Sequence, residues 1–499
     1  MDLPTLDASV RKWQSLPSSL APIKSEVETE TKLSVEPDFR LPTLSGHPLP
    51  RRIFTSIYFD TLDHCLARSS ITLRRRLENG SAAWQLKLPL NGARREIELR
   101  EASVTPPARI VQALVVLLEG KHLVPIAELH TSRAGVRVCE GRHNVAEVVL
   151  DTVSVLRGGS VIQQFREVEI ELLHGEDEFI ERLASALHAV GARPHDGRPK
   201  LFRALSLAYD SLDAPAADAS IVDHIRYSLL QQLQNLKRCD PGVRLGGETE
   251  DVHQIRVAAR RMRTILLAVH KIVRPEWVEP SLCGLKWLGE VFARARDLDV
   301  QISYFQREAE QLKARDRRPL ERFLRHLRSE RERAQQTLMD EMKSARYLGF
   351  VSKLREAAEA PAVVNTKDTL MDVAARQFRK LRKTIRRLKR SPSNADLHRV
   401  RIKSKRARYA AELAEAVDGK AVTRFVKTAE RFQNLLGTHQ DAVLAERYVQ
   451  GLLKYQGGQQ AAFTAGLLVA RANQQREEVR EEFWPEWKRL KKRGNRAWR

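Results

Sequence analysis

Charged side chains alternate with less polar ones along residues 26–33, where Glu26, Glu28, Glu30 and Lys32 occupy every second position. This period of two is typical of a β-strand and places all four charges on one face. Three later segments repeat the pattern with charges of either sign: Arg74 and Arg76, then Glu96 and Glu98, then Glu167, Glu169 and Glu171. One such strand is usually a solvated sheet face, whereas four predict a closed barrel with a polar lumen.

These residue types suit one chemistry. Carboxylates on neighbouring strands are hard oxygen ligands for Mg²⁺ or Mn²⁺, which are commonly held by one or two carboxylates, water and phosphate oxygens. Arginine and lysine between them bind phosphate oxygens, arginine in bidentate fashion. The pattern therefore predicts a metal-dependent site for a polyphosphate chain, at which catalysis depends on positioning and charge neutralisation.

A second pattern occurs twice in the C-terminal half, 145 residues apart. Its polar members fall at i, i+3, i+7 and i+10, which is one continuous face of a helix. Two copies facing each other predict a cationic trough without acids, whose natural occupant is a linear polyanion. The two sets are His253, Arg256, Arg260 and Arg263, then His398, Arg401, Lys405 and Arg408.

Other charged residues of this half are expected to have ordinary roles. Asp297, Asp299 and Asp441 follow the two repeat copies, and we expect them to cap helices or pair with arginines rather than bind metal. Basic runs at 379–390 and 488–499 are interpreted as solvated faces. They lack interleaved aromatic residues for stacking bases, so no specific nucleic-acid partner is expected.

The net charge of the 499-residue chain is unevenly distributed. Residues 1–210 hold 27 basic and 27 acidic side chains, so the whole excess of +23 lies in residues 211–499, which hold 59 and 36. Such asymmetry predicts two domains with different partners, the second adapted to something polyanionic.

Several classes of protein are excluded by the composition. The four cysteines are far apart and form no CxxC pair, which argues against a disulfide framework and a structural zinc site. The longest apolar run, 113–118, is far shorter than the roughly 20 residues of a membrane helix, and the N-terminus has no signal-peptide order. We expect a soluble cytoplasmic protein without a membrane partner.

Periodicity predicts a strand-rich first domain and an all-helical second one. Helices are predicted at 106–119 and 178–190, and helical spacing covers about 217–490. The predicted divisions are an N-terminal extension at 1–23, a domain at 24–210, a linker at 211–219, a helical domain at 220–490 and a basic tail at 491–499. Strands are predicted at 26–33, 55–60, 72–77, 83–88, 94–99, 134–138, 144–150 and 165–172.

The first domain resembles the CYTH domain of triphosphate tunnel metalloenzymes over about residues 24–208. The ordered series that carries the resemblance is Glu28-x-Glu30-x-Lys32, Leu73-Arg74-Arg75-Arg76, Leu86-Lys87, Arg95-Glu96-x-Glu98, Val149-Leu150-Asp151 and Glu167-Val-Glu169-Ile-Glu171. The resemblance implies an eight-stranded antiparallel β-barrel whose tunnel binds triphosphate with a divalent metal ion, Mg²⁺ or Mn²⁺.

The resemblance also implies roles for individual residues. Glu28, Glu30 and Lys32 would carry catalysis. Metal would be held by Glu28, Glu30, Glu169 and Glu171, with Asp151 or Glu167 completing the set. Phosphates would be bound by Lys32, Arg74, Arg76, Lys87, Arg95, Arg133 and Lys200.

The second domain resembles the CHAD domain over about residues 217–490, on the two His/Arg helices together with Arg296-Asp297-Leu-Asp299-Val and His439-Gln440-Asp441. The resemblance implies two pseudo-symmetric four-helix bundles with a basic channel that binds inorganic polyphosphate. The expected fold class is thus α+β multidomain, a barrel followed by an all-α domain.

The leading functional expectation is an inorganic triphosphatase that hydrolyses tripolyphosphate to pyrophosphate and phosphate, with one metal ion bridging phosphate oxygens and a second activating water. The helical domain would bind polyphosphate and associate the protein with polyphosphate granules. The alternatives are a polyphosphate-binding protein with little activity, a thiamine triphosphatase and an adenylate cyclase. Trp84, near Lys87, is either a stacking platform for an organic group or a structural aromatic. The oligomeric state is left open.

Overall fold

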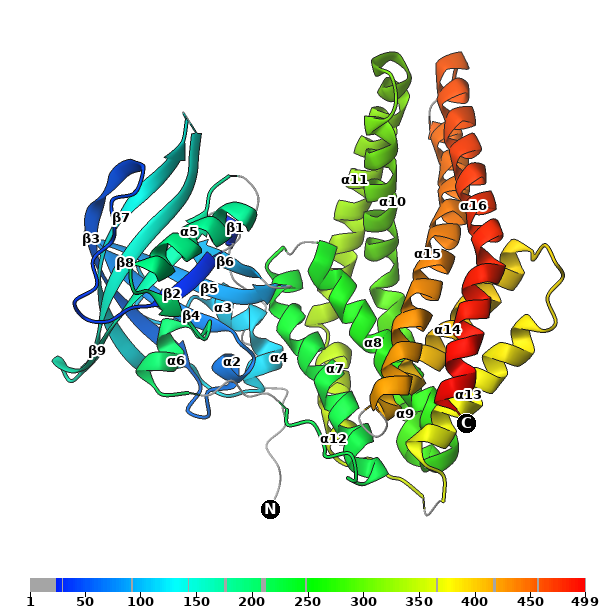
Figure 1. Ribbon diagram of the computed structural model, residues 1–499, viewed down its shortest axis with the longest axis horizontal. Helices are drawn as coiled ribbons and strands as arrows, with labels where there is room; N and C mark the ends of the chain where they lie inside the picture. Colours follow the sequence, from blue (N-terminus) through cyan, green and yellow to red (C-terminus); the bar gives the residue numbers. More distant parts are fainter. Residues whose placement is uncertain are drawn as a thin grey trace. The chain divides into compact units, whose positions relative to one another are not determined.

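The computed structural model describes residues 24–28, 30–90, 93–141, 143–174, 177–207, 212–246, 249–364, 367–415, 419–455 and 457–498. The predicted extension at 1–23 lies outside these residues. The chain divides into two compact units, Met1–Asp210 and Ser211–Arg499, the first built on a sheet and the second on helices (Figure 1).

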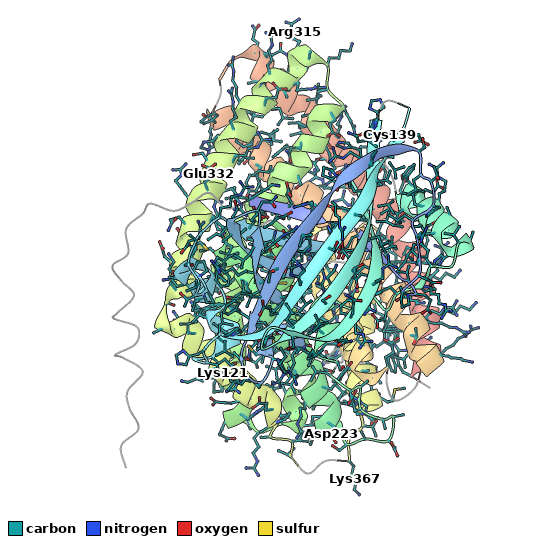
Figure 2. All side chains as sticks on the ribbon, turned by 90° about the vertical axis from the view of Figure 1, so that its left-hand side faces the viewer. Lys121, Cys139, Asp223, Arg315, Glu332 and Lys367 are labelled. Atoms are coloured by element: carbon teal, nitrogen blue, oxygen red, sulfur yellow. The ribbon has the colours of Figure 1, made fainter. Side chains whose placement is uncertain are left out.

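The first unit is built on one antiparallel sheet with the strand order β1-β6-β5-β4-β3-β7-β8-β9-β2-β10. Its long central strands form a curved ribbon in Figure 2, in which Cys139 lies near the end of β7 and Lys121 lies shortly before its start. The strands are β1 (Lys24–Glu28), β2 (Glu30–Ser34), β3 (Gly46–Asp60), β4 (Thr72–Glu78), β5 (Ser81–Leu90), β6 (Ala93–Leu99), β7 (Val124–Glu140), β8 (His143–Arg157), β9 (Ser160–Leu172) and β10 (Arg193–Pro194).

Within the described residues the sheet is open and has ten strands, rather than the closed eight-stranded barrel that was predicted. The segment predicted as one strand at 26–33 is described on both sides of position 29, as β1 and β2. Its first part, β1, pairs with β6, and its second part, β2, pairs with β9. Within the described residues no ladder joins β1 to β2. One extended segment therefore supplies hydrogen bonds to both outer regions of the sheet.

The period of two in the strands separates a core face from a charged face. On β9, Val168 and Ile170 are fully buried in a cluster with Leu187 of α5 (Asp177–Ala189). Burial of each such aliphatic side chain stabilises the fold by roughly 1.5–3 kcal/mol. The glutamates at 167, 169 and 171 take the alternate positions, so packing of the apolar side against α5 fixes where the carboxylates point.

Short helices cover other parts of the sheet. Leu201 and Phe202 of α6 (Lys200–Ala204) pack with Phe165 of β9, which holds the first residue of α6, Lys200, beside the charged face. The helix predicted at 106–119 is interrupted at Leu114, which separates two helices. The remaining helices of this unit are α2 (Cys65–Arg68), α3 (Ala108–Ala113) and α4 (Val115–Leu118).

The second unit is helical throughout its described residues, apart from an isolated bridge between Val273 and Val363. No described helix is both long and apolar enough to span a membrane. The helices are α7 (Ile221–Arg244), α8 (Thr249–Val269), η1 (His270–Ile272), α9 (Pro275–Val291), α10 (Ala293–Glu310), α11 (Ala314–Lys343), α12 (Ala345–Glu359), α13 (Leu370–Ile385), α14 (Asn394–Ala414), α15 (Gly419–Tyr455) and α16 (Gln459–Ala497).

The two repeat motifs lie on α8 and α14, and these helices contact each other. The start of α14 is fixed by a capping box, in which the Ser393 hydroxyl accepts the Asp396 N–H while the Asp396 carboxylate accepts the Ser393 N–H.

The bundle cores do not follow the two copies. One core joins α13, α14, α15 and α16, whereas another joins α10 and α11 with the outer parts of α15 and α16. The long helices α15 and α16 of the second copy therefore pack in both cores. The predicted basic tail at 491–499 is corrected, since α16 continues to Ala497.

Candidate functional site

A cavity of about 180 Å³ lies on the charged face of the sheet. Sixteen residues line it, of which eight are basic and five acidic. No lining residue is a large apolar side chain. The lining residues are Glu30, Lys32, Arg52, Tyr58, Thr72, Arg74, Arg76, Lys87, Arg94, Glu96, Arg133, Glu147, Glu169, Glu171, Pro199 and Lys200.

The strands β3 to β6 contribute a mainly cationic wall: Arg52, Arg74, Arg76, Lys87 and Arg94 against the single acid Glu96. The guanidinium of Arg74 donates to Gln85 Oε1 at 2.8 Å, and Lys87 Nζ lies 3.0 Å from Glu96 Oε2. Burial and the nearby Arg74 lower the pKa of Arg76 to about 10. Glu78 of β4 also pairs with Arg52 at 2.6 Å and with Arg76 at 2.9 Å, so five cations face two acids and the wall keeps an excess of positive charge.

The strands β2, β8 and β9 contribute a mainly acidic wall. In the strand register Glu30 pairs with Glu171, and Glu171 pairs with Glu147, so three carboxylates form one row across three strands. Directly opposed residues have Cβ atoms roughly 4.5–5.5 Å apart. The cavity thus has carboxylates on one half of the sheet and cations on the other.

A buried ion network closes the acidic side. Glu169 Oε1 lies 2.7 Å from Lys32 Nζ and 2.6 Å from Lys200 Nζ. The other oxygen of Glu169 lies 2.5 Å from Arg133 Nη2. Burial alone would raise the pKa of Glu169, but Lys200 and Lys32 outweigh it and hold that pKa well below its usual value. These cations are therefore fixed in place by acids.

Asp151 and Glu167 lie beneath the cavity lining and are fully buried. Arg133 forms two hydrogen bonds to Asp151, at 2.8 and 2.6 Å. Lys200 Nζ lies 3.0 Å from Asp151 and 2.8 Å from Glu167. Burial opposes the charge on Lys200, yet Glu167 and Glu169 raise its pKa. Asp151 and Glu167 therefore position basic residues rather than line the cavity.

The structure brings nine of the predicted sheet-domain site residues to the cavity. Glu28 ends β1, where it pairs in register with Arg94, and its side chain lies outside the described residues. Arg95 is a correction: strand alternation places it with Ile97 and Leu99 on the opposite face, where it is buried. The nine are Glu30, Lys32, Arg74, Arg76, Lys87, Arg133, Glu169, Glu171 and Lys200.

Several lining residues were missed from the sequence. Arg94 and Glu96 precede Glu98 at the same strand period, and Glu147 precedes Asp151 by four residues, so the alternation contained a signal for each. Arg52 had no such signal, because charged and apolar residues do not alternate regularly around it. Tyr58, Thr72 and Pro199 complete the missed set.

The oxygen donors of the acidic wall fit a hard divalent ion. Among the described residues no three His, Cys, Asp or Glu side chains converge as a ready-made metal site, because the innermost carboxylates are engaged by Lys32, Arg133 and Lys200. Mg²⁺ sites that also bind phosphate usually need only one or two carboxylates. Glu30 and Glu171, adjacent in register and both at the cavity, meet that requirement.

The predicted trough residues of the second unit lie on α8 and α14 (Figure 1). Within the described chain, no carboxylate lies within the 4.0 Å salt-bridge distance of Arg260, Arg263, Arg401 or Lys405. Burial and the neighbouring Arg296 also lower the pKa of His253. We call the surface formed by His253, Arg256, Arg260, Arg263, Arg401 and Lys405 the trough.

The prediction of a trough without acids is corrected at two positions. Arg408 lies 3.0 Å from Glu412 and 3.1 Å from Glu430, so its charge is already neutralised. Arg256 lies 2.9 Å from Asp297.

The first residue of the second motif, His398, is exposed and hydrogen-bonds Gln440 Oε1 at 2.7 Å through Nδ1. The expected pairing of acids with arginines is observed for Asp297, and for Asp299, which lies 2.9 Å from Arg331.

Lys405 is the residue of the trough most affected by its surroundings. Burial, then the like charges of Arg260, Arg401 and Arg408, lower its pKa to about 6. Asp441 of α15 lies near this group. Burial raises the pKa of Asp441, and the positive charges of Arg401 and Lys405 partly oppose that rise. Asp297 and Asp441 are outnumbered by the cations, so the trough remains strongly positive.

Both units match known protein families. Residues 26–195 match the model of the CYTH domain, and residues 228–450 match that of the CHAD domain. The chain is a two-domain CYTH–CHAD protein. The CYTH match supports a triphosphate-tunnel enzyme. CYTH enzymes generally depend on a divalent metal ion.

Whole-chain and single-domain relatives accompany these matches. The CYTH–CHAD chain is 27% identical to the uncharacterized protein Rv2226 of Mycobacterium tuberculosis over 484 residues, which cover 90% of this chain and 92% of that protein. PptA from Streptomyces chartreusis is 19% identical, with a TM-score of 0.45, and covers 55% of this chain and 100% of its own. The CHAD domain from the plant Ricinus communis is 22% identical, with a TM-score of 0.46, over 55% of this chain and 94% of its own.

Proposed function

We propose that the CYTH cavity hydrolyses inorganic tripolyphosphate to pyrophosphate and phosphate with a divalent metal ion, and that the CHAD domain binds inorganic polyphosphate. The observation that supports the first part is the division of charge within one cavity. A phosphate chain needs cations on one side and a carboxylate-held metal ion on the other, and the two halves of the sheet supply these.

The lining favours an inorganic over an organic triphosphate. Thirteen of the sixteen lining residues are charged, and the only aromatic among them, Tyr58, is 3% exposed. Trp84, the alternative stacking platform, is fully buried against Phe59, with ring centroids 4.9 Å apart. An adenine or thiamine ring would therefore find little apolar surface in this cavity.

Each wall has a separate task in the proposed reaction. Arg74, Arg76, Lys87 and Arg94 bind phosphate oxygens and hold the chain in line. Glu30 and Glu171 would hold Mg²⁺ or Mn²⁺, which neutralises phosphate charge when bound. Lys32 and Lys200 fix Glu169 and prevent its repulsion of the substrate.

For the CHAD domain, the support is the unpaired charge of the trough. Arg260, Arg401 and Lys405 lie close together without acids in salt-bridge distance among the described residues. A polyanion that enters the trough relieves this repulsion, so binding is electrostatic and weakens with salt. The association with polyphosphate granules and a cytoplasmic location follow from this proposal as expectations.

The test of the CYTH activity is a substrate panel of tripolyphosphate, ATP and thiamine triphosphate with Mg²⁺ or Mn²⁺. We expect phosphate release from tripolyphosphate to exceed that from either organic triphosphate. Arg74→Met should lower kcat/KM, whereas Arg100→Met should not, because Arg100 is exposed and pairs with Glu98 outside the cavity. Cyclic AMP formation or a preference for thiamine triphosphate would replace the proposal with one of the alternatives.

The same panel separates enzyme from binding protein. If none of the three substrates is hydrolysed while polyphosphate still binds, the chain is a polyphosphate-binding protein. The trough is tested by Arg260→Ala with Lys405→Ala, which should weaken polyphosphate binding.

A further inference from the structure

A second basic cavity, of about 390 Å³, lies at the end of α13 and in the turn that follows it. Five side chains line it, and all are basic: Arg379, Arg382, Lys383, Arg386 and Arg387. They fall at i, i+3, i+4, i+7 and i+8, which keeps them on one side of the helix and its last turn. We call this cavity the α13 bay.

The bay contains unneutralised charge. Among the described residues none of the five forms an ion pair. Arg382 donates a hydrogen bond to the neutral Asn495 Oδ1 of α16 at 3.5 Å. The end of α16 lies alongside, because Gly494 packs on Phe378 of α13 (Figure 1). No aromatic residue lines the bay, so stacking of nucleic-acid bases has no platform there.

The repeat does not need these five charges in order to fold. The positions 145 residues earlier are Gln234, Lys237, Arg238, Pro241 and Gly242, of which only two are basic. The negative end of a helix dipole favours cations, but only within the last turn. Arg379 lies six residues before the helix end at Ile385, and five adjacent like charges repel one another.

A line of cations connects the bay to the trough. Arg263 of the trough lies near Arg406 of α14, since its charge contributes to the lowered pKa of Arg406 after burial. Arg406 is in turn among the cations that, after burial, lower the pKa of Lys380 on α13. Lys403 and Lys271 belong to the same group around Lys380. The positive surface therefore continues from α8 across α14 to α13.

We propose that the α13 bay is a second site for an inorganic polyphosphate chain, so that one long chain occupies the trough and the bay at the same time. The proposal rests on the proposed polyphosphate binding of the CHAD domain and adds a dependence on chain length. A chain that spans both sites gains effective concentration at the second site once the first is filled, which raises affinity by up to 10²–10⁴-fold. A chain too short to span them gains nothing.

The test compares the full-length protein with a bay variant, R379A/K383A/R386A/R387A, in metal-free buffer. These four side chains are exposed, so their truncation leaves the α13 core intact. The matched control is R318A/R322A/R325A/R328A, which removes four exposed arginines from α11. The probes are short-chain and long-chain inorganic polyphosphate, with affinity measured at several salt concentrations.

We expect the bay variant to bind long chains at least ~10-fold more weakly and to bind short chains as the wild type does. Its plot of log K against log salt for long chains should be shallower by about 3, at about 0.7 for each of four lost phosphate contacts. The control variant should retain most of the affinity and slope. Unchanged long-chain affinity and slope in the bay variant would overturn the inference.

Two further arms separate this inference from its premise and from another ligand. Short-chain binding that survives Arg260→Ala with Lys405→Ala would refute the trough, whatever the bay variant does. If the bay variant loses affinity for single-stranded RNA and keeps it for polyphosphate, the bay is a nucleic-acid site and the inference fails.

Discussion

Proton uptake at Lys405 is a direct consequence of the trough. Lys405 has a pKa of about 6 in the free protein because of burial and the surrounding arginines. A bound phosphate chain supplies the opposite charge and returns that pKa toward the usual lysine range. Binding above pH 6 must therefore take up a proton. The charged groups that face Lys405 are Arg256 and Arg260 of α8, Arg401 and Arg408 of α14, and Asp441 of α15.

The magnitude follows from the two protonation states. At pH 7.5 a lysine with a pKa of about 6 is only about 3% protonated, so binding takes up about one proton. Linkage then requires the affinity to rise up to ~10-fold for each pH unit as pH falls toward 6, and to level off below it. The sign is fixed because protonation favours the bound state.

The assay is isothermal titration calorimetry with long-chain polyphosphate at pH 7.5 in buffers of different ionisation enthalpy. Wild type should show uptake of about one proton, and Lys405→Arg should show none while it still binds, because arginine is charged in both states. Lys405→Met should lose both the uptake and part of the affinity. A buffer-independent enthalpy together with a flat pH profile in the wild type would refute the reasoning.

Three further perturbations test other parts of the structure. Lys200→Met leaves Asp151, Glu167 and Glu169 without their shared cation and should destabilise the CYTH domain by about 3–5 kcal/mol in urea unfolding. Lys121→Met breaks only an exposed pair with Asp63 and should cost under about 1 kcal/mol; equal losses would show that the buried network is not cooperative. Arg94→Met should lower kcat/KM for tripolyphosphate by ~10-fold or more, as expected for the loss of a charge-assisted contact. Arg95→Met, on the opposite face, should not lower it. A larger loss in Arg95→Met than in Arg94→Met would show that the assigned strand phase is wrong. Gly494→Ala would place a Cβ 2.3 Å from Phe378 Cζ and should lower the stability of the helical unit by about 1–3 kcal/mol. Gly466→Ala on the same helix meets nothing within 4 Å and should be neutral or slightly stabilising, and similar effects of both changes would contradict the packing at Gly494.

Most elements of the CYTH sheet could be predicted from the sequence, because one face is apolar and the other charged. On β9, Val168 and Ile170 alternate with glutamates, so the period alone shows both the strand and the phase. The strand predicted at 134–138 is part of a longer one, β7, because its earlier residues mix polar and apolar types on both faces.

The path of the first strand could not be predicted. Residues 26–33 have an unbroken period, and only the folded sheet shows that the residues of β1 pair with β6 whereas those of β2 pair with β9. Helix packing in the CHAD domain could not be predicted either. The repeat indicates two copies, whereas the long helices α15 and α16 enter a core shared with α10 and α11.

The site was predicted where the strand phase was unambiguous. Arg94, Arg95 and Glu96 are consecutive charges, so the residue that faces the cavity depends on the phase set by Ile97 and Leu99 in the core. On α14, Glu412 lies four residues after Arg408, a spacing at which opposite charges on a helix interact. The contact of Arg408 with Glu430 needed the tertiary structure.

The central claim is that the acidic wall and the cationic wall together hydrolyse an inorganic triphosphate. Its most direct test is the rate of metal-dependent phosphate release from tripolyphosphate by wild type and Glu30→Ala, with Glu140→Ala as the control. Glu140 is exposed and pairs only with Arg182 at the surface. We predict robust release by wild type and the control, and a loss of about 100-fold or more in Glu30→Ala. Normal turnover in Glu30→Ala, or none in the wild type, would contradict the account.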